Sequence, residues 1–127
     1  KHTPGTHDLK VNLLFPQLED IIGVEAATLL VAIYSHRIDK IKIRRVQANG
    51  ENNVINFHTD VSLRTMQVAL NGEDQYEGGR LMYVTMDGLQ QPSRQAGAVT
   101  IHDNTIPHGV SEMISGCRYG LLFITSD

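Results

Sequence analysis

Residues 40–46, KIKIRRV, mark the place where the spacing of apolar residues along this chain changes. Inside this stretch basic and apolar residues alternate, which is the pattern of a half-buried strand. Before it, apolar residues recur at intervals of three and four, the pattern of an amphipathic helix; they are Leu18, Ile21, Ile22, Ala26, Leu29, Leu30 and Ile33. The chain is therefore predicted to have a helical region that ends at about residue 37 and to form strands after residue 39.

The helix is expected to cover residues 16–37, with Pro16 in its first turn and Gly23 as a point where it can divide in two. We expect it to pack on the outside of a β-sheet. The residues predicted to be buried at this contact are Leu29, Leu30 and Ile33 on the helix and Leu121 and Phe123 on a strand. Residues 1–10 are polar and are expected to form an arm.

About eight short strands joined by turns are predicted after the helix. The strand-like stretches are KIKIRRV, VINFHTD, RTMQVALN, RLMYVT, AVTIH, HGVSEM and RYGLLFIT, and the intervening turns and loops are ANGENN, GEDQYEGG, DGLQQPSRQ, DNTIP and SGC. Helices followed by many short strands predict a mostly β (α+β) fold, a jelly roll supported by N-terminal helices. We expect a single domain over residues 1–127, with an arm and helices over 1–39 and the β core over 40–127.

Composition excludes some classes of protein. The net charge of −3 gives no basic excess for nucleic-acid binding, and no apolar run reaches the roughly 18 residues of a membrane span. Cys117 is the single cysteine, so an internal disulfide is impossible. We expect a cytoplasmic rather than a secreted protein.

His58 and Asp60 are candidate metal ligands. Side chains two apart on a strand point the same way, so an imidazole and a carboxylate would project together. One such pair is a weak signal among six histidines and fourteen acidic residues. His108, at the start of HGVSEM, supplies a third ligand, and two histidines with one carboxylate suit non-haem Fe(II). His102 is expected to be an ordinary hydrogen-bonded histidine rather than a ligand.

Arg118 is the second candidate for a functional role. In RYGLLFIT one face holds Arg118 and Gly120 with two apolar residues, and the other face is also largely apolar, so the strand is predicted to be buried on both sides. A buried arginine is unfavourable unless an anion pairs with it, and no acidic residue lies near Arg118 in the sequence. A bound carboxylate would match the fork of the guanidinium group. We expect Arg118 to lie on the strand beside His108, after a turn at SGC.

The order of His58, Asp60, His108 and Arg118 resembles the Fe(II)/2-oxoglutarate dioxygenases, and most closely their prolyl 4-hydroxylase-like branch. The resemblance covers about residues 40–126, including Gly78-Gly79 and the segment AGAVTIHDNTIPHGVSEMISGCRYGLLF. It implies a double-stranded β-helix, a jelly-roll variant. It also implies that His58, Asp60 and His108 bind Fe(II) and that Arg118 binds the distal carboxylate of 2-oxoglutarate. Oxygen is then the further co-substrate, and ascorbate is a candidate accessory cofactor.

The sequence departs from this branch at Ala69, where a tyrosine that contacts 2-oxoglutarate is common. Gln67, on the same face, is the candidate substitute. The resemblance implies hydroxylation of a prolyl or other side chain in a protein or peptide. The alternatives are the same chemistry on a free amino acid or other small molecule, and a cupin-like module that holds a metal without turnover.

A nucleic-acid dioxygenase is disfavoured, because the closing strand lacks that branch's pair of arginines. The alternating basic residues Lys40, Lys42 and Arg44 are expected to lie on a solvated face of the sheet, with a substrate-steering patch as the alternative.

Overall fold

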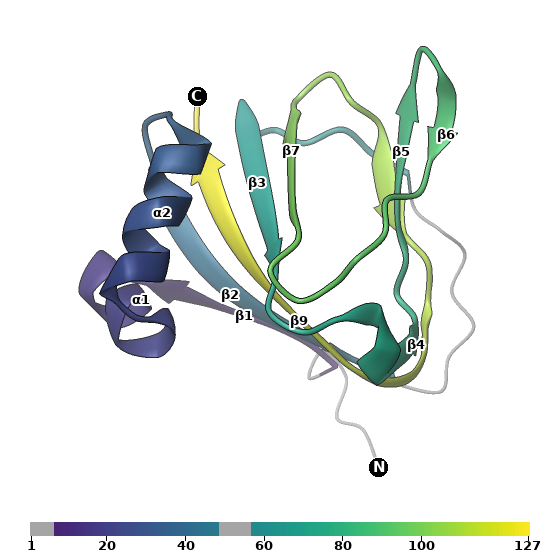
Figure 1. Cartoon of the computed structure of the whole chain (residues 1–127). Helices are drawn as coiled ribbons and strands as arrows, with labels where there is room; N and C mark the ends of the chain where they lie inside the picture. Colours follow the sequence, from purple (N-terminus) through teal and green to yellow (C-terminus); the bar gives the residue numbers. More distant parts are fainter. Residues whose placement is uncertain (1–6, 49–56) are drawn as a thin grey trace.

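The computed structural model describes residues 7–48 and 57–127, which form two helices and two antiparallel sheets (Figure 1). The elements in chain order are β1 (Asp8–Leu13), α1 (Phe15–Ile22), α2 (Val24–Tyr34), β2 (Lys40–Gln47), β3 (Arg64–Ala69), a 3₁₀ turn η1 (Glu73–Gln75), β4 (Tyr76–Gly78), β5 (Leu81–Thr85), β6 (Gly88–Gln90), β7 (Val99–Asp103), β8 (His108–Val110) and β9 (Met113–Thr125). Neither helix is long and apolar enough to cross a lipid bilayer.

The larger sheet has the strand order β1-β2-β9-β3-β7, and β4 joins it by pairing with the first part of β9. The smaller sheet has the order β6-β5-β8. This arrangement of two antiparallel sheets confirms the prediction of a mostly β jelly-roll fold with N-terminal helices. Strand β9 has 13 residues and lies between β2 and β3 at the centre of the larger sheet.

The apolar core lies between the helices and the outer face of the larger sheet. It is formed by Leu18, Ala27, Leu30 and Tyr34 from the helices and by Ile41, Met66, Val68, Leu121 and Phe123 from the strands. The predicted burial of Leu30, Leu121 and Phe123 is confirmed, but Leu29 and Ile33 are 60% and 43% exposed. The prediction was wrong because the helix breaks at Gly23, where φ is +92°, and α2 therefore begins a new turn with its own buried face.

The inner face of the larger sheet is built from the alternate residues of the same strands. Because directly opposite residues on antiparallel strands share a face, the register places Arg44, Gly120 and Ala69 in one row and Lys42, Leu122, Gln67 and Thr100 in the next. These two rows face away from the helices. Polar and basic side chains therefore line the space between the sheets.

Two predicted boundaries differ from the structure at the ends of the sheet. Asp8–Leu13 forms strand β1, so residues 8–10 are not part of an arm. The SGC segment is not a turn between strands, because β9 runs through it and bends at Gly116, where φ is +81°. As a result Arg118 lies opposite Val46 of β2, and His108 lies opposite Tyr83 of β5 rather than beside Arg118.

Three shorter segments also differ from their prediction. Of VINFHTD, residues 54–56 lie outside the described residues, and residues 57–60 make only an isolated bridge, between His58 and His108. The predicted loop GEDQYEGG contains η1 and β4, and the predicted loop DGLQQPSRQ contains β6. The bridge at His58 and the pairing of β4 with β9 join residues far apart in the sequence, which local composition does not reveal, whereas β6 forms a local hairpin with β5 that the prediction missed.

Candidate metal centre

His58, Asp60 and His108 converge on one point between the sheets. The Nε2 atoms of His108 and His58 lie 3.2 Å and 3.6 Å from Oδ1 of Asp60. One ligand atom from each residue lies within 4.8 Å of the other two. The main chains of His58 and His108 exchange two hydrogen bonds, of 3.0 Å and 2.9 Å, which hold the imidazole rings 4.5 Å apart.

His108 is held in the tautomer that leaves Nε2 available. Its Nδ1 lies 3.0 Å from the carbonyl oxygen of Ile106, to which it donates. Burial lowers the pKa of His108 below its ordinary value, so that the neutral imidazole is favoured. A neutral imidazole whose other nitrogen is hydrogen-bonded to a carbonyl is the usual form of a metal-ligating histidine.

Asp60 is held by its second oxygen. Oδ2 accepts hydrogen bonds from Nε2 of His102 at 2.7 Å and from the Thr65 hydroxyl at 3.2 Å, while Oδ1 faces the two candidate ligand histidines. Thr65 and His102 lie directly opposite each other on β3 and β7. The hydrogen bond from His102 keeps the pKa of Asp60 below its ordinary value, so the carboxylate remains ionised.

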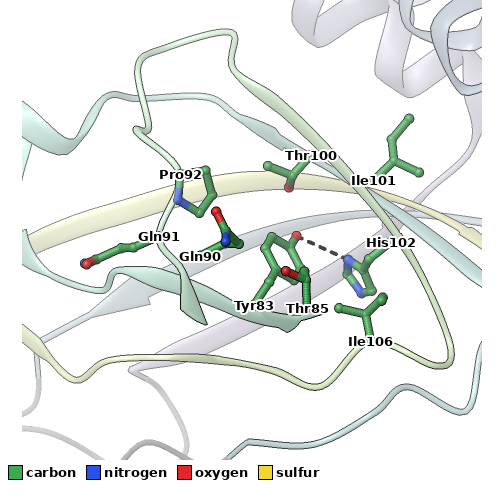
Figure 2. A pocket seen from close by; sticks show the side chains of 9 residues that line it. All are labelled: Tyr83, Thr85, Gln90, Gln91, Pro92, Thr100, Ile101, His102 and Ile106. Carbon is green, nitrogen blue, oxygen red and sulfur yellow. Dashed lines mark hydrogen bonds between the residues drawn. The ribbon is translucent and has the colours of Figure 1, made fainter. Parts of the chain in front are cut away.

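His102 therefore supports Asp60 through a hydrogen bond. This agrees with its prediction as an ordinary hydrogen-bonded histidine. Its side chain is 2% exposed, and its Nδ1 lies 3.3 Å from the Tyr83 hydroxyl (Figure 2). Burial raises the pKa of Tyr83, so the hydroxyl keeps its proton and donates to Nδ1, while Nε2 donates to Asp60. No local pattern in the sequence indicates this chain of contacts, because it depends on the register of β3, β5 and β7.

Two cavities are lined by residues of this group. The first, of about 380 Å³, is lined by the three candidate ligands together with Lys10, Lys42, Arg44, Val61, Ser62, Thr65, Gln67, Val110, Leu122 and Ile124. The second, of about 440 Å³, is lined by Tyr83, Thr85, Gln90, Gln91, Pro92, Thr100, Ile101, His102 and Ile106 (Figure 2).

The lining corrects the prediction for the basic residues of β2. Lys40 is exposed, but Lys42 and Arg44 are half-buried and line the first cavity instead of lying on a solvated face. Arg44 is held by a two-pronged ion pair with Asp8, at 2.8 Å and 2.7 Å. Gln67 lies on the wall of this cavity, and its contact with a co-substrate stays a prediction.

Arg118 is 2% exposed, and its Nε and Nη2 atoms have no hydrogen-bond partner within the described part of the chain. Burial, followed by the positive charge of Arg94, lowers the pKa of Arg118 to about 10. Leu122, four residues further along the same face of β9, lines the cavity that holds the candidate ligands. A second buried arginine, Arg94, was missed because it lies in a segment predicted to be a loop.

This architecture occurs in known structures. The chain superimposes on an oxidoreductase of the 2OG-Fe(II) oxygenase family from Burkholderia pseudomallei with a TM-score of 0.67 over 98% of its length, at 13% identity. The fold is that of the 2OG-Fe(II) oxygenases. Within this fold, a prolyl hydroxylase from Trichoplax adhaerens, in complex with a peptide fragment of hypoxia inducible factor, gives a TM-score of 0.68 over 94% of the chain at 13% identity.

A prolyl 4-hydroxylase from Phytophthora capsici shares the oxygenase fold as well, with a TM-score of 0.61 over 92% of the chain at 15% identity. The chain spans 70% of the Burkholderia protein, 63% of the Trichoplax protein and 47% of the Phytophthora protein. No protein-family model and no curated protein matches the sequence.

The three candidate ligands of this oxygenase fold fit a metal ion. Ligand atoms bound to one ion at about 2.1 Å and at right angles are about 3 Å apart, close to the separations between Asp60 Oδ1 and the two Nε2 atoms. Two imidazoles and one carboxylate that leave further positions open are the donor set of non-haem Fe(II) sites. The hydrogen bonds to His108 and Asp60 supply the outer contacts that such ligands need.

Proposed function

We propose that this protein is an Fe(II)- and 2-oxoglutarate-dependent dioxygenase that hydroxylates a C–H bond. The observation that carries the proposal is the arrangement of Asp60, whose Oδ1 faces His58 and His108 while its Oδ2 is held by His102 and Thr65. An ordinary ion pair on the surface would not need two further hydrogen bonds to orient its carboxylate. The fold, shared with the 2OG-Fe(II) oxygenases, adds to it.

The residues of the chain have separate tasks in this proposal. His58, Asp60 and His108 hold Fe(II), and Arg118 orients 2-oxoglutarate by pairing with its distal carboxylate. When bound, the metal and 2-oxoglutarate supply the oxidising chemistry, in which the two atoms of O₂ enter succinate and the hydroxylated product, with release of CO₂. The low pKa of Asp60 and the neutral form of His108 keep both ligands ready to bind the cation. Bound substrate and co-substrate would limit the access of water to the reacting groups.

The substrate class we favour is a prolyl or other side chain in a protein or peptide. The peptide-bound Trichoplax prolyl hydroxylase has this fold, and the side chain of His58 is 52% exposed, which leaves the centre open to a large substrate. A free amino acid or other small molecule is the second candidate, since a cavity of about 380 Å³ is large enough for one. Ascorbate as an accessory cofactor remains part of the proposal.

The test is release of succinate from 2-oxoglutarate in the presence of Fe(II) and O₂, with a panel of prolyl peptides and free amino acids. We expect turnover that depends on one of these substrates and that is lost in Asp60→Ala. Asp87→Ala, in the exposed turn between β5 and β6, is the matched control. If the wild-type protein binds Fe(II) but neither binds nor consumes 2-oxoglutarate, the dioxygenase proposal fails and a metal-binding module replaces it.

A further inference from the structure

Arg94 is a buried arginine in the segment between β6 and β7, and its main chain is fixed by Glu73. Its N–H donates to Oε2 of Glu73 at 3.2 Å, and its carbonyl oxygen accepts from the N–H of Glu73 at 2.8 Å. The residue is 7% exposed. Its Nη2 donates to the carbonyl oxygen of Tyr119 at 3.2 Å and lies 3.3 Å from the point where a Cβ at position 120 would stand. Arg94 therefore reaches the inner face of β9, beside Arg118.

Two small residues make room for this side chain. Gly120 is the next residue after Arg118 on the inner face of β9, and it lies directly opposite Ala69 of β3. Cross-strand neighbours share a face, so at these two positions the inner face carries nothing larger than a methyl group, while Arg44 lies opposite Gly120 on the β2 side. A Cβ at position 120 would crowd the Arg94 guanidinium group, which shows that the space at Gly120 is used by Arg94.

The polar atoms at this place lack partners within residues 7–48 and 57–127. They are Nε of Arg94, Nε and Nη2 of Arg118, and the hydroxyl oxygen of Tyr76, and all four are buried. Burial and the positive charge of Arg44 act against the charged form of both guanidinium groups, Tyr76 favours it, and no carboxylate of the described residues is among the main influences on either. Two buried guanidinium groups without a counter-charge are unfavourable unless an anion completes the site.

We propose that Arg94 and Arg118 together bind the distal carboxylate of 2-oxoglutarate, which makes Arg94 a second anchoring residue of the co-substrate site. This inference rests on the function proposed above. An ionised carboxylate accepts about four hydrogen bonds, and the four donors without a geometric partner are Nε of Arg94, Nε and Nη2 of Arg118 and the Tyr76 hydroxyl, which lies close enough to both guanidinium groups to favour their charged form. With two cations at this end of the site, a 2-oxo acid that lacks the distal carboxylate should bind poorly.

The experiment is calorimetric titration of 2-oxoglutarate and of 2-oxopentanoate into the Fe(II)-loaded protein without oxygen. 2-Oxopentanoate keeps the 2-oxo acid end but lacks the distal carboxylate. We expect Arg94→Met to weaken 2-oxoglutarate binding by about tenfold or more, or about 1.4 kcal/mol, and to leave binding of 2-oxopentanoate unchanged. Arg94→Lys should fall between the two, because it keeps the charge but loses the fork.

Arg80→Met is the matched control, because Arg80 also contacts Glu73, at 3.4 Å, but its side chain is 38% exposed instead of buried. It should bind 2-oxoglutarate as the wild type does. Thermal melting without ligand checks the fold: loss of an unpaired buried charge should leave the melting temperature of Arg94→Met equal to or above that of the wild type. A lower melting temperature would mean that Arg94 is structural, and the proposal would be rejected.

The two proposals fail in different ways. If Arg118→Met loses 2-oxoglutarate binding but Arg94→Met binds it as tightly as the wild type, then the dioxygenase proposal stands and Arg94 is not an anchor. If the wild type binds no 2-oxoglutarate, or binds 2-oxopentanoate equally well, then the co-substrate assignment itself fails and the role of Arg94 fails with it.

Discussion

At the scale of single residues, the two oxygens of Asp60 divide the work of the candidate centre. Oδ1 faces the histidines that would share a metal ion with it, and Oδ2 is held by His102 and Thr65. A carboxylate fixed in this way keeps its orientation when the metal is absent. The positions of the ligands should therefore be set before the metal binds, which lowers the entropy lost on binding.

Substitutions at the centre should separate ligands from supports. We expect His58→Ala, Asp60→Ala and His108→Ala each to abolish Fe(II) binding at micromolar metal. His102→Ala should weaken it by about 10- to 100-fold, the usual effect of losing an outer contact of a ligand. Titration of Fe(II) without oxygen measures this, with the exposed His36→Ala as control. Equal losses in His102→Ala and His108→Ala would contradict the division of roles.

Arg118 gives the second prediction at this scale. Arg118→Ala should weaken 2-oxoglutarate binding by roughly tenfold or more, since each charge-assisted hydrogen bond contributes about 1.5–3 kcal/mol. Arg118→Lys should fall between Arg118→Ala and the wild type, and Fe(II) affinity should barely change in either. Separate titrations of metal and 2-oxoglutarate measure both effects. An unchanged affinity for 2-oxoglutarate in Arg118→Ala would favour the module without turnover.

The sequence allowed the prediction of some of these residues and not others. His58, Asp60, His108 and the buried position of Arg118 were predicted from spacing, strand alternation and charge, although residues 57–60 form only an isolated bridge and not the expected strand. His102 as the partner of Asp60, and Arg94 as the neighbour of Arg118, follow only from how distant strands and loops are paired. No local pattern specifies that register, so neither contact could be predicted.

At the scale of elements, helix α2 was correctly predicted to be a helix that packs on the sheet, but the wrong face of it was predicted to be buried. The sequence predicted the helix and its packing partners on β9, but the break at Gly23 changes the rotation of everything after it. Ala27, Leu30 and Tyr34 form the buried face in place of Leu29 and Ile33. A periodicity counted through a break cannot give the phase of the second segment.

Leu29 and Leu30 therefore make a matched pair for mutation. Leu30→Ala should lower the free energy of unfolding by about 2–5 kcal/mol, because it leaves a cavity against the sheet. Leu29→Ala, at an exposed site of the same helix, should change it by no more than about 0.5 kcal/mol. Urea denaturation of both variants gives the comparison. Equal losses would show that α2 is rotated relative to the structure described here.

The ion pair between Asp8 and Arg44 joins strand β1 to β2 and gives a prediction about pH. The hydrogen bond from Arg44 lowers the pKa of Asp8 below 3.8. A carboxylate whose pKa is lowered by folding stabilises the protein above its unfolded pKa, and this contribution is lost as the pH falls through the folded value. Asp8→Asn should therefore lose up to about 1 kcal/mol at pH 7.

The same comparison at pH 3 should give a smaller difference between Asp8→Asn and the wild type. Denaturant titrations of the two proteins at both pH values measure it. A difference that is equal at pH 7 and pH 3 would mean that the charge of Asp8 does not stabilise the pairing of β1 with β2.

At the scale of the whole molecule, the chain passes between the two sheets four times, and two of these passages, from β4 to β5 and from β8 to β9, lie side by side. The two passages are hydrogen-bonded to each other, from the N–H of Gly79 to the carbonyl of Glu112 and from the N–H of Ser111 to the carbonyl of Arg80, both at 2.9 Å. A Cβ at Gly78 would lie 2.1 Å from the carbonyl oxygen of Glu112. Only glycine fits at this crossing.

Gly78→Ala should therefore destabilise the protein far more than Gly88→Ala. Both glycines have positive φ, of +79° and +100°, but a Cβ at Gly88 meets nothing within 4 Å. Backbone strain of about 1–3 kcal/mol applies to both, so the difference between the variants isolates the clash at the crossing. Thermal and urea unfolding provide the measurement. Similar stabilities would show that the two passages are further apart than in this structure.

Strand β9 also has a consequence for how the chain acquires its structure during translation. It pairs with β2, β3 and β4, all of which leave the ribosome before it. Translation adds about 5–20 residues per second. Several seconds therefore pass between synthesis of the helices and earlier strands and synthesis of the strand that joins them. Leu30 and Tyr34 lack their core partners Leu121 and Phe123 during this time, so we expect the nascent chain to be a client of ribosome-associated chaperones until residues 113–125 emerge.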